Sequence, residues 1–73
     1  MAQRRDKMGH ELVAEWMAAH GLTETALADR IGVKRQALYY YRARNRPYSG
    51  PIAVALADIT GIEVGALLRS RAA

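Results

Sequence analysis

The sequence predicts a small all-α fold of five short helices, and three observations lead to that prediction. Apolar residues recur at helical spacing in each of five segments. No stretch of useful length alternates apolar and polar residues as a half-buried strand does. Glycines directly follow several of the segments, where helices commonly end. With 73 residues the chain forms one domain with a thin core, which excludes a barrel or a multi-domain enzyme.

The first three helices follow one another closely. The first is predicted over residues 10–20 and ends at Gly21. Its apolar residues share one face: Leu12, Val13, Trp16 and Met17. The second begins after Thr23, a good N-cap residue, and ends before Gly32. Its buried stripe consists of Leu27, Ala28 and Ile31. The third helix is predicted over residues 34–43, after a turn of only two residues.

Two more helices follow a polar segment, residues 44–50. Pro51 is expected at the first position of the fourth helix, where its fixed φ angle and missing N–H are tolerated. The apolar stripe of this helix has the spacing i, i+3, i+4, i+7: Ile52, Ala55, Leu56 and Ile59. Gly61 ends it, and a short fifth helix is predicted over residues 63–69.

These helices define one domain over residues 9–69. Residues 1–8 are polar and basic and are expected to form a flexible arm, and residues 70–73 a frayed tail. Cysteine is absent, which excludes disulfides and thiolate metal sites. The longest apolar stretch, residues 52–57, is far shorter than the roughly 20 residues that span a bilayer. We therefore expect a soluble cytoplasmic protein with no membrane contact.

The net charge of +4 is unevenly distributed along the chain. Residues 30–46 hold six of the eleven cations and no acid, whereas residues 47–68 hold two acids and no base. Solvated helices usually alternate the sign of their charges, so an uncompensated basic segment predicts a polyanionic partner. The six cations are Arg30, Lys34, Arg35, Arg42, Arg44 and Arg46.

Residues 23–42 have the pattern of a helix-turn-helix, in which two helices meet across a short turn that contains glycine. Four residues satisfy the demands of this motif. Ala28 is small where the second helix of the motif crosses the first helix of the motif, and Gly32 can take the positive φ angle that the turn requires. Val33 is apolar and fills the gap after the turn, and Leu38 anchors the second helix of the motif, the third of the chain, in the core.

From about Leu12 to Leu68, the chain resembles the phage lambda repressor/Cro-like family of helix-turn-helix proteins, also called the xenobiotic-response-element type. Besides the four motif residues, the resemblance rests on three segments: Gly21-Leu22-Thr23, Arg46-Pro47 and Gly61-Ile62-Glu63-Val64-Gly65-Ala66-Leu67-Leu68. It implies a transcriptional repressor of a phage, prophage or mobile element that binds palindromic double-stranded DNA as a homodimer in the bacterial cytoplasm, at the nucleoid.

Three positions depart from the pattern of this family. Glu24 stands where the family usually has a glutamine that helps to hold a phosphate. The family often has glutamate and then glycine just after the second helix of the motif, whereas this chain has Arg42 and no glycine before Gly50. Glu63 stands where a serine usually caps the last helix.

The third helix is the expected recognition helix. At about 100° per residue, one half of it presents Arg35, Gln36, Tyr39, Tyr40 and Ala43, while Leu38 and Tyr41 lie on the other half. Arginine can pair with guanine O6 and N7, and glutamine with adenine N7 and N6. Tyr39 can contact a thymine methyl group or a phosphate. The resemblance implies base contacts at Lys34, Arg35, Gln36, Tyr39 and Tyr40.

Contacts to the DNA backbone are expected from three arginines at the end of the third helix and just beyond it, and from the start of the second helix. The phosphate candidates are Thr23, Arg42, Arg44 and Arg46. The arm offers a further set, Arg4, Arg5 and Lys7, with an unstructured solubilising end as the alternative. Val64 and Leu68 share a face at i, i+4 and are expected to form an isologous dimer contact. The alternative is a monomer whose last helix only covers the core.

The main alternative to DNA binding is a protein-interaction module. The exposed pair Tyr39-Tyr40 would also suit a protein groove, as in an antitoxin-like protein-interaction module on the same fold. The chain shows no nucleophile–base pair and no phosphate-binding glycine loop, so no enzymatic activity is expected. His10 and His20 are ten residues apart without metal-ligand spacing, so neither a metal nor a cofactor is expected.

Overall fold

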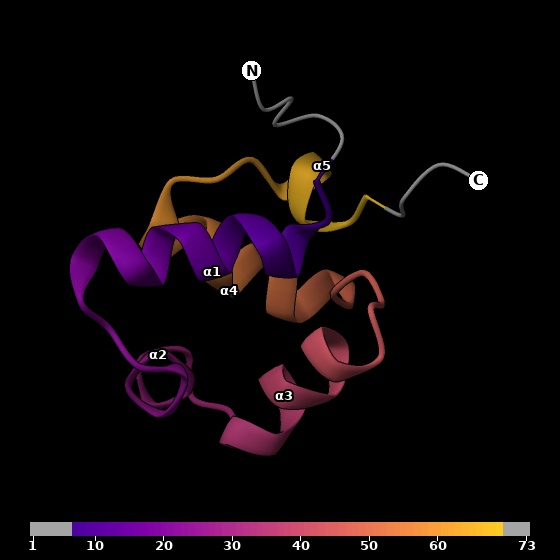
Figure 1. Ribbon diagram of the computed structural model, residues 1–73. Helices are drawn as coiled ribbons and strands as arrows, with labels where there is room; N and C mark the ends of the chain where they lie inside the picture. The colour runs from indigo at the N-terminus through magenta and orange to yellow at the C-terminus, as the bar shows by residue number, and fades with distance from the viewer. Residues whose placement is uncertain (1–6, 70–73) are drawn as a thin grey trace.

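The computed structural model describes residues 7–69 and is all-helical over that range (Figure 1). In chain order the elements are α1 (Gly9–His20), α2 (Glu24–Ile31), α3 (Arg35–Ala43), α4 (Gly50–Thr60) and α5 (Val64–Leu67). The five helices fall in the five predicted segments, so the predicted fold class is confirmed. No strand occurs within residues 7–69.

The helix ends differ from the predicted ends by a few residues, for local reasons. Lys34 is the N-cap of α3 and so lies outside the helix. Ser49 is the N-cap of α4, which places Pro51 at the second helical position and not at the first. Helix α5 is much shorter than predicted, because Glu63 is its N-cap and Leu68 its C-cap.

The core lies where the five helices meet and takes residues from every one of them. Four side chains are completely buried: Leu27, Ala53, Leu56 and Leu67. The core also includes Tyr48 and Ile62, which lie in the connections on either side of α4. The connections on either side of α4 are therefore anchored in the core, just as the helices are.

Helices α2 and α3 lie at the opposite side of the molecule from α5, with α1 and α4 between them (Figure 1). Helix α1 contacts both α3 and α5, and α4 contacts both α2 and α5. The molecule measures 31 × 23 × 21 Å along its principal axes. One end thus carries the helix-turn-helix pair and the other the last helix.

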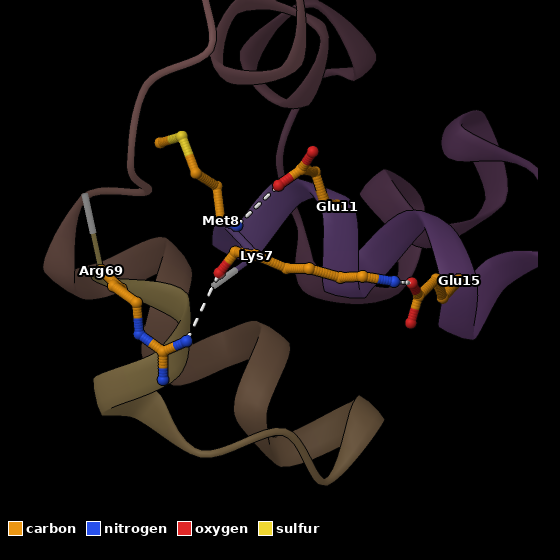
Figure 2. A network of polar contacts seen from close by, with 5 residues as sticks. All are labelled: Lys7, Met8, Glu11, Glu15 and Arg69. Carbon is orange, nitrogen blue, oxygen red and sulfur yellow. Dashed lines mark hydrogen bonds and ion pairs between the residues drawn. The ribbon is translucent and has the colours of Figure 1, made fainter. Parts of the chain in front are cut away.

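Close contacts join the start of α1 to the end of α5 (Figure 2). Nη1 of Arg69 approaches the carbonyl oxygen of Lys7 at 3.5 Å. The start of α1 is itself capped by the backbone N–H of Met8, which donates to Oε1 of Glu11 at 2.8 Å. Gly9 packs so closely on α5 that an added Cβ would lie 2.5 Å from the carbonyl oxygen of Leu67. Only glycine fits at this crossing without a shift of the backbone.

The N-terminal boundary of the domain lies slightly before the predicted one. Met8, assigned to the arm from its sequence, is 2% exposed and belongs to the folded domain. The rest of the predicted arm up to residue 6, and the predicted tail at residues 70–73, lie outside the described residues.

Candidate nucleic-acid interface

Helices α2 and α3 form the helix-turn-helix, and the turn between them has the predicted construction. Gly32 adopts φ 76°, the left-handed region that side chains other than glycine rarely adopt. The N–H of Val33 then donates to the carbonyl oxygen of Ala28 at 3.0 Å. Ala28 and Leu38 are 1% and 2% exposed, so the crossing and the anchor of α3 are both in the core. At the far end of α2, Oγ1 of Thr23 accepts from the N–H of Ala26 at 3.1 Å.

The outward face of α3 carries the residues expected to contact bases. All five are exposed: Lys34, Arg35, Gln36, Tyr39 and Tyr40. The three consecutive tyrosines divide as helical geometry predicts, because Tyr39 and Tyr40 are 47% and 42% exposed while Tyr41 is half-buried. The Tyr41 ring is held between its neighbours, with centroids 5.2 Å from Tyr40 and 5.3 Å from Tyr48. The face is therefore polar and aromatic outside and anchored from within.

The segment after α3 carries two exposed cations, and one of them lies beside this face. The guanidinium carbon of Arg44 lies 5.2 Å from the centroid of the Tyr40 ring, a cation–π geometry, and Arg46 is exposed. Between them Asn45 adopts φ 54°, and its Oδ1 forms a hydrogen bond with Nε2 of His10 at 2.7 Å. The start of α1 thus holds the turn from which both arginines project.

Tyr48 is the residue of this segment that the sequence analysis missed. It is 5% exposed and packs in the core, although polar residues surround it in the sequence. Burial raises the pKa of its hydroxyl well above the ordinary value, and the nearby Glu24 carboxylate raises it further. An aromatic residue between proline and serine in an otherwise polar run was the available clue. Its burial fastens the far end of the arginine segment.

Two departures from the family pattern, Glu24 and Arg42, meet in the fold. Nε of Arg42 donates to Oε2 of Glu24 at 3.1 Å, and Nη2 donates to Oε1 at 3.2 Å. These hydrogen bonds and the charge of Glu24 raise the pKa of the Arg42 guanidinium. The Glu24 side chain is only 16% exposed, against 47% for Arg42. Arg42, expected to contact a phosphate, is therefore occupied by a carboxylate of the same chain.

The remaining candidates are dispersed. The ammonium of Lys7 pairs with Glu15 on α1 (Figure 2), while Arg4 and Arg5 lie outside the described residues. On α5 and its C-cap, Val64 is half-buried and Leu68 is 42% exposed, whereas Leu67 is buried. Val64 and Leu68, the residues expected at a dimer contact, belong to α5 and its C-cap, which lie at the end of the molecule opposite the helix-turn-helix (Figure 1).

Both histidines have structural partners. His20, the last residue of α1, stacks on the Trp16 ring at 4.2 Å between centroids, and its Nδ1 lies 3.3 Å from the carbonyl oxygen of Trp16. Among residues 7–69 there is no group of three side chains suited to holding a metal ion. Within that same range, none of the helices has the length and apolar character needed to cross a bilayer.

The fold and this site define a helix-turn-helix domain. The family model for helix-turn-helix proteins matches residues 13–67, most of the chain. The chain belongs to this family, the lambda repressor/Cro-like helix-turn-helix proteins. At the level of the family it is a DNA-binding transcription regulator, and the family is not an enzymatic one. No curated protein and no solved structure matches the chain.

Proposed function

We propose that the protein is a Cro-like repressor that binds a palindromic operator as a homodimer, with α3 of each copy in the major groove. The observation that carries this proposal is the outward face of α3, where Arg35, Gln36 and Tyr39 project together from a helix anchored by Leu38. Two such helices would enter successive major grooves roughly 34 Å apart. Occupancy of the operator would then exclude RNA polymerase.

Base reading is assigned to the first two turns of α3. Arg35 pairs with guanine through its two parallel donors, and Gln36 pairs with adenine through its amide. Tyr39 and Tyr40 contact thymine methyl groups or sugar–phosphate atoms, and Lys34 reaches a base edge or a phosphate from the N-cap. The exposure of all five residues supports this assignment.

Binding to the DNA backbone is assigned to Arg44 and Arg46, to the start of α2 beside Thr23, and to the arm residues Arg4 and Arg5. The support for Arg44 is its place beside Tyr40, next to the base-reading face. The first turn of a helix presents unpaired N–H groups, and these suit a phosphate. Contacts of this kind fix the position of the protein on the duplex without reading its sequence.

The homodimer is assigned to Val64 and Leu68. Support comes from the exposure of Leu68, a large apolar side chain, at the end of the molecule away from α3. A contact at that end leaves both copies of α3 free for the duplex. Because a dimer contact of this type is isologous, each residue meets the same patch of the second copy.

Salt titration tests the proposal against its rival, an antitoxin-like protein-interaction module that would use the exposed Tyr39 and Tyr40. Binding to a random duplex, followed by fluorescence anisotropy, should weaken steeply with salt, since each phosphate contact contributes a slope of about −0.9 to the log–log plot. A contact anchored by aromatic side chains would barely change with salt. No binding to the duplex at low salt would contradict the proposal.

A further inference from the structure

We propose that Glu24 and Arg42 form an intramolecular clasp that positions Tyr39 for base reading, so that Arg42 determines specificity and does not act as a phosphate contact. The inference rests on the proposed function, in which α3 reads bases. Three contacts carry it. Two are the paired hydrogen bonds from the Arg42 guanidinium to both oxygens of Glu24, at 3.1 and 3.2 Å. The third places the Arg42 guanidinium carbon 5.0 Å from the centroid of the Tyr39 ring.

The clasp fastens the open side of the helix-turn-helix. The turn at Gly32 joins the end of α2 to the start of α3, so the start of α2 and the end of α3 are the two ends left unjoined. Glu24 is the first residue of α2, and Arg42 lies in the last turn of α3. Their pair, 18 residues apart in sequence, ties these ends together. The angle between the two helices is thus held at both sides.

Glu24 is the fixed half of the pair. Its side chain is 16% exposed, and a carboxylate in the first turn of a helix is stabilised by the helix dipole. The planar guanidinium matches the two carboxylate oxygens, which gives the pair one preferred geometry. Arg42 is therefore held in one orientation although 47% of its side chain is exposed.

That orientation places the guanidinium over Tyr39. Tyr39 is 47% exposed and lies one turn after Gln36 on the base-reading face. A cation held over one side of its ring limits the rotation of the ring, so the hydroxyl is presented in a narrow range of positions. Arg42 acts through Tyr39 and is a positioning residue.

The clasp also changes how Arg42 responds to DNA. A phosphate that approaches the guanidinium finds two of its five N–H donors taken by Glu24 and meets the repulsion of that carboxylate. The charge of Arg42 is thereby compensated by Glu24 before any duplex binds, whatever its sequence. The pair should favour the correct site over random DNA while adding little to the salt-dependent affinity.

The test compares Arg42→Gln with the matched control Arg44→Gln, whose guanidinium stacks on Tyr40 in the same region. Affinity is measured for the site that the wild-type protein selects from random duplexes and for an unrelated duplex, over a range of salt. For Arg42→Gln the ratio of the two affinities should fall about threefold to fivefold, the upper range of coupling for exposed ion pairs, with an unchanged salt slope. Arg44→Gln should weaken both equally and reduce the slope by about 1.

Two further variants separate a clasp from a simple charge. Arg42→Lys keeps the charge but loses the paired geometry, so its affinity ratio should fall as far as that of Arg42→Gln. Glu24→Ala frees the guanidinium without supplying the glutamine that the family uses to hold a phosphate, so affinity for the unrelated duplex should rise and the slope should steepen by about 1. In the double variant, Glu24→Ala should cause no further loss of the ratio beyond that of Arg42→Gln alone.

An Arg42→Gln variant that loses affinity equally for both duplexes, with the slope reduced by about 1, would overturn the clasp and make Arg42 an ordinary phosphate contact. Full retention of the ratio in Arg42→Lys would overturn it as well. If the wild-type protein selects no site, that result contradicts the proposed function, but it does not test the contact between Glu24 and Arg42. The clasp is then judged on the free protein by NMR: slow exchange of the Arg42 Nε–H with water, lost in Glu24→Ala, supports it, and fast exchange in the wild type contradicts it.

Discussion

Arg35 stands in the first turn of α3, exposed and one residue beyond the N-cap Lys34. Its place in the first turn allows its side chain to reach the floor of a major groove while the start of the helix rests near the phosphates. The other arginine of α3, Arg42, is paired with Glu24 and lies against Tyr39. Arg35 is therefore expected to contribute the largest share of base discrimination.

Replacing Arg35 with alanine should cost roughly 1–3 kcal/mol of affinity for the selected site and relax specificity at one base pair of each half-site. The measurement is competition binding against single-base variants of the site. Affinity for an unrelated duplex should change much less, because most of it comes from other cations. Unchanged affinity for both the site and the unrelated duplex would show that Arg35 is not a recognition residue.

Arg44→Ala should differ from Arg35→Ala in affecting every duplex and not mainly the selected site. Its loss should weaken binding to every duplex by a similar factor and reduce the slope of log affinity against log salt by about 1. The salt dependence is measured on the selected site and on a random duplex with the same protein preparation. A loss confined to the selected site would instead assign Arg44 to base reading through its contact with Tyr40.

At the scale of the residue, helical periodicity predicted which side chains of α3 are exposed, but the sequence did not predict which side chains pair across the fold. The division of the three tyrosines followed from the 100° step of a helix and is seen in the structure. The partner of Arg42 did not follow, because Glu24 is brought to it by the crossing of α2 and α3 and not by spacing. Tyr48 was missed because its neighbours are polar, and only the tertiary fold shows where its ring packs.

At the scale of the element, α1 and α5 cross so closely that Gly9 leaves no room for a side chain, whereas the other glycines described have open space where a Cβ would stand. Gly9→Ala would place a methyl group against the backbone of Leu67, and backbone cannot move aside as a flexible side chain does. The expected result is a loss of about 1–3 kcal/mol in the free energy of unfolding, measured by urea denaturation.

Gly65→Ala is the matched control for this prediction. Gly65 lies in α5 with open space where a Cβ would stand. Because alanine favours helix by about 0.5–1 kcal/mol over glycine, this variant should be neutral or slightly stabilised. If Gly9→Ala were equally well tolerated, the close packing of α1 on α5 would be wrong.

The existence of every helix could be predicted, whereas several ends could not. Glycine after the helix placed the ends of α1, α2 and α4 well, because a left-handed residue stops a helix locally. Helix α5 came out shorter than its apolar spacing suggested. Its Leu67 is buried by α1 and α4, so packing and not helix length put that residue in the core.

At the scale of the whole molecule, the basic segment of residues 30–46 and the proposed dimer residue Leu68 lie at opposite ends. The six cations of residues 30–46 belong to the end of α2, to α3 and to the segment after it, while the exposed Leu68 follows α5 at the other end. This separation suits a dimer that joins at one end and binds DNA at the other. It follows from the fold, since the sequence shows the two surfaces but not their relative positions.

Leu68→Glu should abolish the proposed dimer, because two carboxylates would face each other across an isologous contact. Sedimentation equilibrium should then report a monomer at concentrations where the wild type is a dimer. Val54→Glu is the control, since Val54 is an apolar residue on α4 with 58% exposure and lies outside the proposed contact. A wild type that is monomeric at all concentrations, or a dimer unaffected by Leu68→Glu, would contradict this assignment.

The most direct test of the central claim is selection of binding sites from random double-stranded DNA, carried out in parallel with the wild type and with Arg35→Ala. The wild type is expected to enrich a two-fold symmetric motif whose half-sites lie about one helical turn apart. Arg35→Ala should enrich the same motif with its preference lost at one symmetric pair of positions. Failure to enrich any motif, or an identical motif from both proteins, would contradict the claim that α3 reads DNA through its exposed face.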